Sequence, residues 1–233
     1  MVAARSVEAD ASGGGRRGRI VSATGLRLIL QTAILMAAFS VSGHAQERLA
    51  PAKSGLEAKL EYCKTCHGLS GQGYLGYFAM PRLAGQQPEY IEAQLRAFIE
   101  RRRSNPVMQN VAHVLSPSMI TALAMHFKNL NPKPFGGAPR GSIATGKRIY
   151  EEGLPEANVP ACSACHGNEG MGQNEIPRLA GQVYPYMVGQ LTSWKQQRGQ
   201  GTAVDTSAIM APTAHNLTRS QVEAVAAYVS YLQ

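Results

Sequence analysis

The segment ACSACHGNEGMGQNEIPRLAGQ (residues 161–182) repeats much of an earlier segment, YCKTCHGLSGQGYLGYFAMPRLAGQ (residues 62–86). Both contain C-x-x-C-H, and both end in the six letters PRLAGQ. The two copies of PRLAGQ align at an offset of 96 residues, and the same offset pairs Tyr90 with Tyr186, Gln94 with Gln190, Leu95 with Leu191, and Phe98 with Trp194. These pairs recur at i, i+4, i+5 and i+8, a spacing that predicts a helix in each copy.

A second match lies further along the chain, at an offset of 102 residues. MQNVAH (residues 108–113) pairs with MAPTAH (residues 210–215), and an amphipathic helical pattern follows both segments. The apolar positions of that pattern are Ile120, Leu123, Phe127 and Leu130 in the first copy and Val222, Val225, Val229 and Leu232 in the second. Most of the chain is therefore an internal repeat of two units.

Helix-start signals precede the last helix of each unit. In the first unit Ser116 stands before Pro117, a residue that suits the first position of a helix. In the second unit Thr218 and Gln221 have the spacing of a capping box. Each unit is predicted to run helix, C-x-x-C-H, loop, helix, loop, helix. The fold class is thus all-α. Met108 and Met210, which pair with each other in the repeat, are each predicted to lie in an irregular segment before the last helix.

Between the units, residues 131–142 read NPKPFGGAPRGS, a Pro- and Gly-rich segment without helical period. Such a composition is typical of a linker. We therefore predict an N-terminal domain at residues 46–130 and a C-terminal domain at residues 143–233. A domain of about 90 residues buries only a modest core, and its short helices are marginal without a large apolar group to pack around.

Residues 1–45 are predicted to be an export signal. Arg16, Arg17, Arg19 and Arg27 precede an apolar run at residues 28–41, and Gly43 and Ala45 occupy the −3 and −1 positions of a cleavage site after Ala45. The alternative is a retained membrane anchor, although this run is shorter than the roughly 20 apolar residues that span a bilayer. Export takes the protein out of the cytoplasm.

The chain has a formal net charge of +8, and removal of residues 1–45 leaves 18 basic and 13 acidic residues, a net charge of +5. The basic residues are scattered except for Arg101, Arg102 and Arg103. Because export also separates the protein from DNA, nucleic-acid binding is not expected. The arginine triplet is typical of a solvent-exposed helix end, and the alternative is a docking site for an anionic partner protein.

All four cysteines belong to the two C-x-x-C-H motifs: Cys63, Cys66, Cys162 and Cys165. Two thiols at this spacing can each form a thioether to a haem vinyl group, and the adjacent His67 or His166 then ligates the iron. A redox dithiol is expected with a βαβ pattern, which the chain lacks. A zinc site built from both cysteine pairs leaves the two histidines unexplained. Two covalently attached c-type haems are therefore predicted.

The repeat also predicts the other axial ligand of each iron. Met108 and Met210 are the only methionines beyond the export signal that occur in register. Methionine ligation raises the potential of the haem and closes the iron to other ligands. His113 and His215 also match each other, so bis-histidine ligation is the alternative. Core packing is the usual role of a single methionine, but two in register favour ligation.

The repeated PRLAGQ segment is predicted to support the haem. A ligating histidine normally donates its second ring N–H to an acceptor, which Pro81 and Pro177 can supply as backbone carbonyls. Arg82 and Arg178 can pair with haem propionates, because a guanidinium matches two carboxylate oxygens. The alternative is a helix-entry turn in which the glycine of PRLAGQ is chosen for backbone shape alone.

C-x-x-C-H, PRLAGQ, Y-x-x-x-Q-L and a methionine before the last helix, each present twice, resemble the dihaem cytochrome c4 family. The resemblance covers the chain from about residue 55 onward. It implies two tandem class I cytochrome c domains, each a few short helices around one covalent haem. It also implies a periplasmic electron carrier, soluble or associated with the inner membrane. Such a carrier passes electrons from a quinol-oxidising complex or a dehydrogenase toward a terminal oxidase.

An electron carrier is favoured over an enzyme, because a methionine on each iron leaves no position for substrate. One alternative is a dihaem redox enzyme, peroxidase-like or thiosulfate-oxidising, in which one iron binds substrate. Another is a cytochrome subunit of a dehydrogenase complex. The loop between Cys66 and Pro81 is three residues longer than the loop between Cys165 and Pro177, so the two haem environments need not be equivalent.

Overall fold

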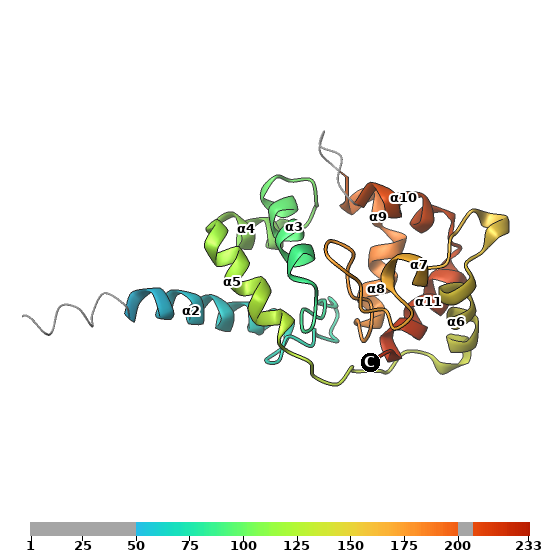
Figure 1. Ribbon diagram of the computed structural model, residues 1–233, viewed down its shortest axis with the longest axis horizontal. Coiled ribbons are helices and arrows are strands. Elements are labelled where there is room, and N and C mark those ends of the chain that lie inside the picture. Colours follow the sequence, from blue (N-terminus) through green and yellow to red (C-terminus); the bar gives the residue numbers. More distant parts are fainter. Residues whose placement is uncertain (1–49, 200–206) are drawn as a thin grey trace, which may run out of the picture. The chain divides into compact units, whose positions relative to one another are not determined.

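The computed structural model describes residues 50–199 and 207–233, with side chains from residue 55 onward (Figure 1). The predicted export signal at residues 1–45 lies outside the described residues. Lys53–Gln233 form one compact unit that contains both copies of the repeat. The described residues are mostly helical and contain isolated β-bridges in place of a sheet, which confirms the predicted all-α class.

The helices of the N-terminal copy are α2 (Ala50–His67), α3 (Pro88–Ile99), α4 (Pro106–His113) and α5 (Pro117–Lys128). The C-terminal copy contains η1 (Arg140–Ser142), α6 (Ile143–Glu152), η2 (Pro155–Ala157), α7 (Ser163–His166), α8 (Tyr184–Thr192), α9 (Trp194–Gln197), α10 (Ser207–Asn216) and α11 (Arg219–Tyr231). No helix within these described ranges is long and apolar enough to cross a membrane.

The N-terminal core forms where α3 packs against α5 and α4. Buried side chains of α3 and α5, among them Ile91, Leu123 and Phe127, meet Leu60 of α2. Leu60, Cys63 and His67 recur on α2 at i, i+3 and i+7, so they share one face of that helix. The face that enters the core therefore also carries the first cysteine and the histidine of the motif.

The C-terminal core forms where α11 packs against α6 and α8. The helices α6 and α11 approach closely at Gly146, because a Cβ there would lie 2.0 Å from the carbonyl oxygen of Ala224. The predicted apolar positions Val222, Val225 and Val229 of α11 are buried in this core. The helix that carries the repeated apolar pattern is thus the central element of the copy.

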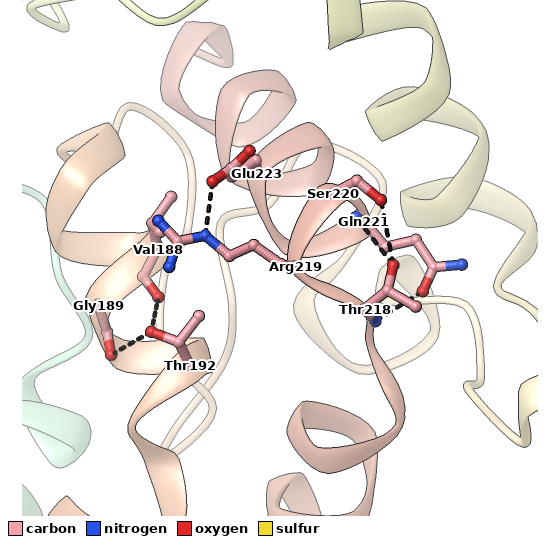
Figure 2. Close-up of polar contacts among 8 residues, drawn as sticks. All are labelled: Val188, Gly189, Thr192, Thr218, Arg219, Ser220, Gln221 and Glu223. Atoms are coloured by element: carbon pink, nitrogen blue, oxygen red, sulfur yellow. Dashed lines mark hydrogen bonds and ion pairs between the residues drawn. The ribbon is translucent and has the colours of Figure 1, made fainter.

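Both predicted helix starts are confirmed. Ser116 accepts a hydrogen bond from the backbone N–H of Met119 at the start of α5, and Pro117 is the first helical residue. Thr218 and Gln221 form the capping box of α11, with 3.3 Å from Gln221 N to Thr218 Oγ1 and 2.8 Å from Thr218 N to Gln221 Oε1 (Figure 2).

The segments that hold the two in-register methionines were predicted to be irregular, and this prediction is wrong. Met108 lies in α4 and Met210 in α10. In α4 the cause is local, because Asn105 accepts a hydrogen bond from the backbone N–H of Met108 at 3.0 Å and Pro106 supplies the first helical position. In the C-terminal copy the helix continues even through an internal proline, Pro212.

Candidate functional site

The first candidate site lies at the C-terminal end of α2. Its last turns carry Cys63, Cys66 and His67, with Cys66 exposed, Cys63 half-buried and His67 only 7% exposed. Burial raises the pKa of the Cys63 thiol, so this group is held as an uncharged thiol at neutral pH. Neither thiol forms a disulfide, and both are therefore available for covalent attachment of a cofactor.

The imidazole of His67 is oriented by the PRLAGQ turn. Its Nδ1 lies 2.9 Å from the carbonyl oxygen of Pro81. A carbonyl can only accept, so Nδ1 donates its proton and Nε2 keeps the lone pair that ligates iron. Burial lowers the pKa of His67, the Pro81 carbonyl opposes this shift, and the charge of Arg103 lowers the pKa further, so the ring stays neutral at pH 7.

The second candidate site repeats this arrangement in the other copy. His166 is buried at the end of α7, and its Nδ1 lies 2.9 Å from the carbonyl oxygen of Pro177. Burial lowers the pKa of His166 and raises the pKa of Cys162 to about 11. Both copies thus present a neutral histidine held by a proline carbonyl beside two free thiols.

The surroundings of the first site suit a large apolar cofactor. A cavity of about 350 Å³ lies against the first site. Its lining includes Cys63 of α2, Val107 and Val111 of α4, and Val114 and Leu115 directly after α4. A second cavity, of about 370 Å³, lies beside His166, and its lining is more polar because it includes Asn168 and Glu169 as well as Met171. Val107 and Val114 are 65% and 62% exposed, so the wall of the first cavity contains apolar surface that a haem would cover. The two free thiols, the oriented histidine and this apolar wall fit a covalently attached haem.

Each candidate methionine and its alternative histidine lie on the same helix but on different faces. Met108 and His113 are five residues apart on α4, which is a rotation of about 140° around the helix axis. Met108 is half-buried and His113 is exposed. On α10, Met210 is half-buried against the C-terminal core and His215 is exposed. One helix can therefore direct only one member of each pair inward.

Arg82 and Arg178 have a use in the protein that the sequence did not indicate. Both are buried, and each donates from Nε at 3.0 Å to the alanine carbonyl two residues further on. Arg82 also donates to Pro132 O at 2.9 Å and to Asn131 Oδ1 at 3.1 Å, which fastens the linker to the PRLAGQ turn. Burial, and then the charge of Arg178, lower the pKa of Arg82 to about 10, so it stays charged at neutral pH.

The glutamine that ends each PRLAGQ joins the two copies. Gln86 accepts from Arg178 N at 2.7 Å and donates to Arg178 O at 3.0 Å. Gln182 does the same toward Arg82, accepting from its N–H at 2.7 Å and donating to its carbonyl at 3.1 Å. Both glutamines are buried. This role was not predicted from the sequence, although the identical position of the glutamine in both repeats is a signal of it.

A second polar connection contains Gln94 and Gln190, which pair with each other in the repeat, together with two arginines. Arg103 donates to Gln94 at 2.8 Å in its own copy, and to Tyr186 at 2.9 Å and Gln190 at 3.0 Å in the other. Arg198 mirrors this, donating to Gln190 at 2.8 Å in its own copy and to Gln94 at 2.7 Å in the other. Each glutamine therefore accepts from both arginines.

The prediction that the arginine triplet lies at a solvent-exposed helix end is wrong for Arg103. Arg101 is exposed and has a left-handed backbone with φ of 59°, whereas Arg103 is only 9% exposed. Arg103 stacks over the ring of Phe98 at 4.7 Å, as Arg198 does over Trp194 at 4.5 Å. The turn at Arg101 reverses the chain after α3 and directs Arg103 back toward the interior.

Several known proteins are similar to this chain. The cytochrome c family model matches residues 143–233. Cytochrome c-552 of Acidithiobacillus ferridurans is 37% identical over 209 residues, covering 88% of this chain and 86% of that protein. The Acidithiobacillus ferrooxidans cytochrome c4 structure is 38% identical with a TM-score of 0.62, covering 73% of this chain and 98% of that one. The chain belongs to the dihaem cytochrome c4 family.

This cytochrome c4 therefore consists of two tandem class I cytochrome c domains and is an electron-transfer protein. It carries two covalent c-type haems, and its two C-x-x-C-H motifs supply one attachment site in each domain. A further relative is the thiosulfate dehydrogenase electron acceptor of Thiomonas intermedia, which is 36% identical over 173 residues, 72% of this chain and 77% of that protein.

Proposed function

We propose that this cytochrome c4 is a periplasmic electron carrier whose two haem irons have histidine and methionine as axial ligands. His67 and Met108 are the ligands in the N-terminal domain, and His166 and Met210 are those in the C-terminal domain. The observation that carries the proposal is the duplicated imidazole geometry, in which a proline carbonyl 2.9 Å from Nδ1 fixes each ring with Nε2 free for iron.

The positions of the methionines support the sixth ligand. Each is half-buried on a helix, while the histidine five residues later is exposed on another face. Iron with histidine and methionine on its two faces exchanges electrons without binding substrate. The chain's own contribution is then to fix the imidazole tautomer, exclude water with apolar side chains and hold the charges around each haem.

The direction of electron flow follows from the class of protein. We place the cytochrome after export through residues 1–45, in the periplasm and in solution or at the inner membrane. Its donor is a quinol-oxidising complex or a dehydrogenase, and its acceptor is a terminal oxidase. The similarity to a thiosulfate dehydrogenase electron acceptor favours one specific second candidate, in which the donor is a thiosulfate-oxidising enzyme. In both cases this chain carries electrons rather than oxidising thiosulfate itself.

The ligand assignment is tested with Met108→Ala and Met210→Ala, and with His113→Ala and His215→Ala as controls on the same helices. Each methionine variant should keep two covalent haems, lose half of the far-red methionine–iron charge-transfer band, and bind carbon monoxide at one haem. Each histidine variant should retain the full band. A band that survives both methionine substitutions, or that disappears in a histidine variant, would contradict the assignment.

The carrier role is tested on the wild-type protein. The fully reduced cytochrome should be reoxidised by membranes that contain a terminal oxidase, and thiosulfate alone should not reduce it. Reduction by thiosulfate only when a thiosulfate dehydrogenase is added would support the second candidate. Direct turnover of thiosulfate or peroxide by the isolated protein would mean that it is an enzyme.

A further inference from the structure

The helices α4 and α5 of the N-terminal copy begin in the same way. Each has an exposed polar cap, a proline at the first helical position and a half-buried methionine at the third. The Asn105 side chain accepts from the backbone N–H of Met108 at 3.0 Å, and the Ser116 hydroxyl accepts from that of Met119 at 3.3 Å. Each cap hydrogen bond therefore ends on the methionine itself and fixes the backbone from which its side chain projects.

The two helices differ in how much else holds them. α5 has 12 residues and buries four side chains in the N-terminal core: Ile120, Leu123, Ala124 and Phe127. α4 has eight residues, all of which the structure describes, and Ala112 is the one that is buried. A helix this short is marginal without support from its surroundings. The cap therefore carries a larger share of the stability of α4 than of α5.

The chain segment before the cap of α4 is itself held in place. The backbone N–H of Ser104 donates to the carbonyl oxygen of Gln197 in the other copy at 2.8 Å. Gln109 of α4 also donates from its side chain to the carbonyl oxygen of Arg103, at 3.2 Å. Asn105 thus projects from a fixed segment. Loss of its hydrogen bond should loosen the first turn of α4 and leave the segment before the helix where it is.

We propose, on the basis of the ligation by His67 and Met108 proposed above, that Asn105 is a positioning residue for the methionine ligand of the N-terminal haem. It acts through the backbone of Met108, by holding the first turn of α4 in one conformation. A methionine on a loosened turn detaches from the iron more often, and an added ligand then binds in its place. Asn105 therefore sets how firmly this iron is closed to other ligands.

The test is the equilibrium binding of imidazole to the ferric full-length holoprotein, followed by haem absorbance. The apparent affinity of imidazole is proportional to the fraction of iron from which methionine has detached. Replacement of an asparagine cap by alanine shifts the equilibrium of a helix by about fivefold, which corresponds to about 1 kcal/mol. Asn105→Ala should therefore bind imidazole about fivefold more tightly at one haem and with the wild-type affinity at the other.

Ser116→Ala is the matched control, because it removes an equivalent hydrogen bond to a methionine N–H from a cap that is also exposed. It should lower the midpoint of urea unfolding and leave both imidazole affinities at their wild-type values. Asn105→Ser should restore wild-type binding, because serine caps a helix as well as asparagine does. Asn105→Gly, a milder loss of the cap, should shift the affinity by less than twofold and covers the case in which the alanine variant yields no holoprotein.

Met108→Ala in the same titrations separates the role of Asn105 from the ligand assignment. If Met108→Ala keeps the full charge-transfer band and both wild-type affinities, the assignment is wrong and the role of Asn105 is lost with it. If Met108→Ala opens one haem while Asn105→Ala binds imidazole as the wild type does, the assignment stands and the positioning role is overturned. An equal gain in affinity in Ser116→Ala would also overturn it, because the effect would then be a general loosening of the domain.

Discussion

The reciprocal glutamines Gln86 and Gln182 allow a quantitative test of how firmly the two domains are joined. Gln86→Ala removes the partners of the N–H and the carbonyl of Arg178, a residue that is 5% exposed. A buried polar group without a partner costs about 1–3 kcal/mol, so two such groups cost about 2–6 kcal/mol. Water that enters the boundary recovers part of this, and we expect a loss of about 2–4 kcal/mol in the free energy of unfolding.

The assay is urea unfolding of the holoprotein, followed both by far-UV circular dichroism and by haem absorbance. With a slope of about 2 kcal/mol per M, the expected loss shifts the midpoint by about 1–2 M. The two signals should coincide in the wild type and separate in Gln86→Ala, because the domains no longer unfold together. Gln196→Ala, at an exposed position of α9, is the matched control and should change the stability by less than about 0.5 kcal/mol.

The double variant decides whether the two glutamines act as one device. Breaking the hydrogen bonds of either glutamine should already separate the domains. In that case the double variant Gln86→Ala with Gln182→Ala should lose clearly less free energy of unfolding than the sum of the two single variants. The reasoning is refuted if Gln86→Ala stays within about 0.5 kcal/mol of the wild type with a single unfolding transition, since the buried hydrogen bonds would then contribute nothing to the joint.

Two further predictions concern the C-terminal domain. Gly146→Ala places a methyl group 2.0 Å from the Ala224 carbonyl oxygen and should destabilise the domain by about 1–3 kcal/mol. Gly189→Ala, whose new methyl group meets no atom within 4 Å beyond its own stretch of helix backbone and its chain neighbours, should stabilise the domain by about 0.5–1 kcal/mol in the same thermal melts. Equal effects would exclude steric contact as the cause. Tyr150→Phe removes a hydrogen bond of 2.5 Å to the turn after C-x-x-C-H and should cost about 1 kcal/mol, against no measurable change for Tyr77→Phe, whose side chain is 96% exposed.

The features that the sequence predicts well are those with a local or periodic signal. The capping box of Thr218 and the Ser116–Pro117 helix start are short motifs whose geometry involves neighbouring residues only, and both are confirmed. The apolar stripe of α11 is likewise read from a period of 3.6 residues. The carbonyl contacts of His67 and His166 could be anticipated because a ligating histidine needs an acceptor and each PRLAGQ begins with a proline close by.

The features that the sequence did not predict depend on contacts between distant residues. Arginine is almost never fully buried without a partner, so an RRR triplet is expected at the surface, and only the fold shows that Arg103 reaches Tyr186 and Gln190. The helices around Met108 and Met210 were missed for another reason. Valine, asparagine and an internal proline lower the helix propensity of these segments. The local start at Asn105 and Pro106 favours α4 despite this, and packing on neighbouring helices favours both helices.

The repeated residues therefore serve two purposes on the same helix. On α3, Ile91 and Phe98 are buried in the N-terminal domain, while Tyr90 and Gln94 turn to the boundary and meet Arg198 of the other copy. Repeats that only built two independent domains would need to retain the apolar positions alone. Tyr90 and Gln94 recur as Tyr186 and Gln190 at the equivalent positions of α8. This recurrence is expected if both faces of the helix are used. One face encloses a haem, and the other joins the two haem domains into a single redox unit.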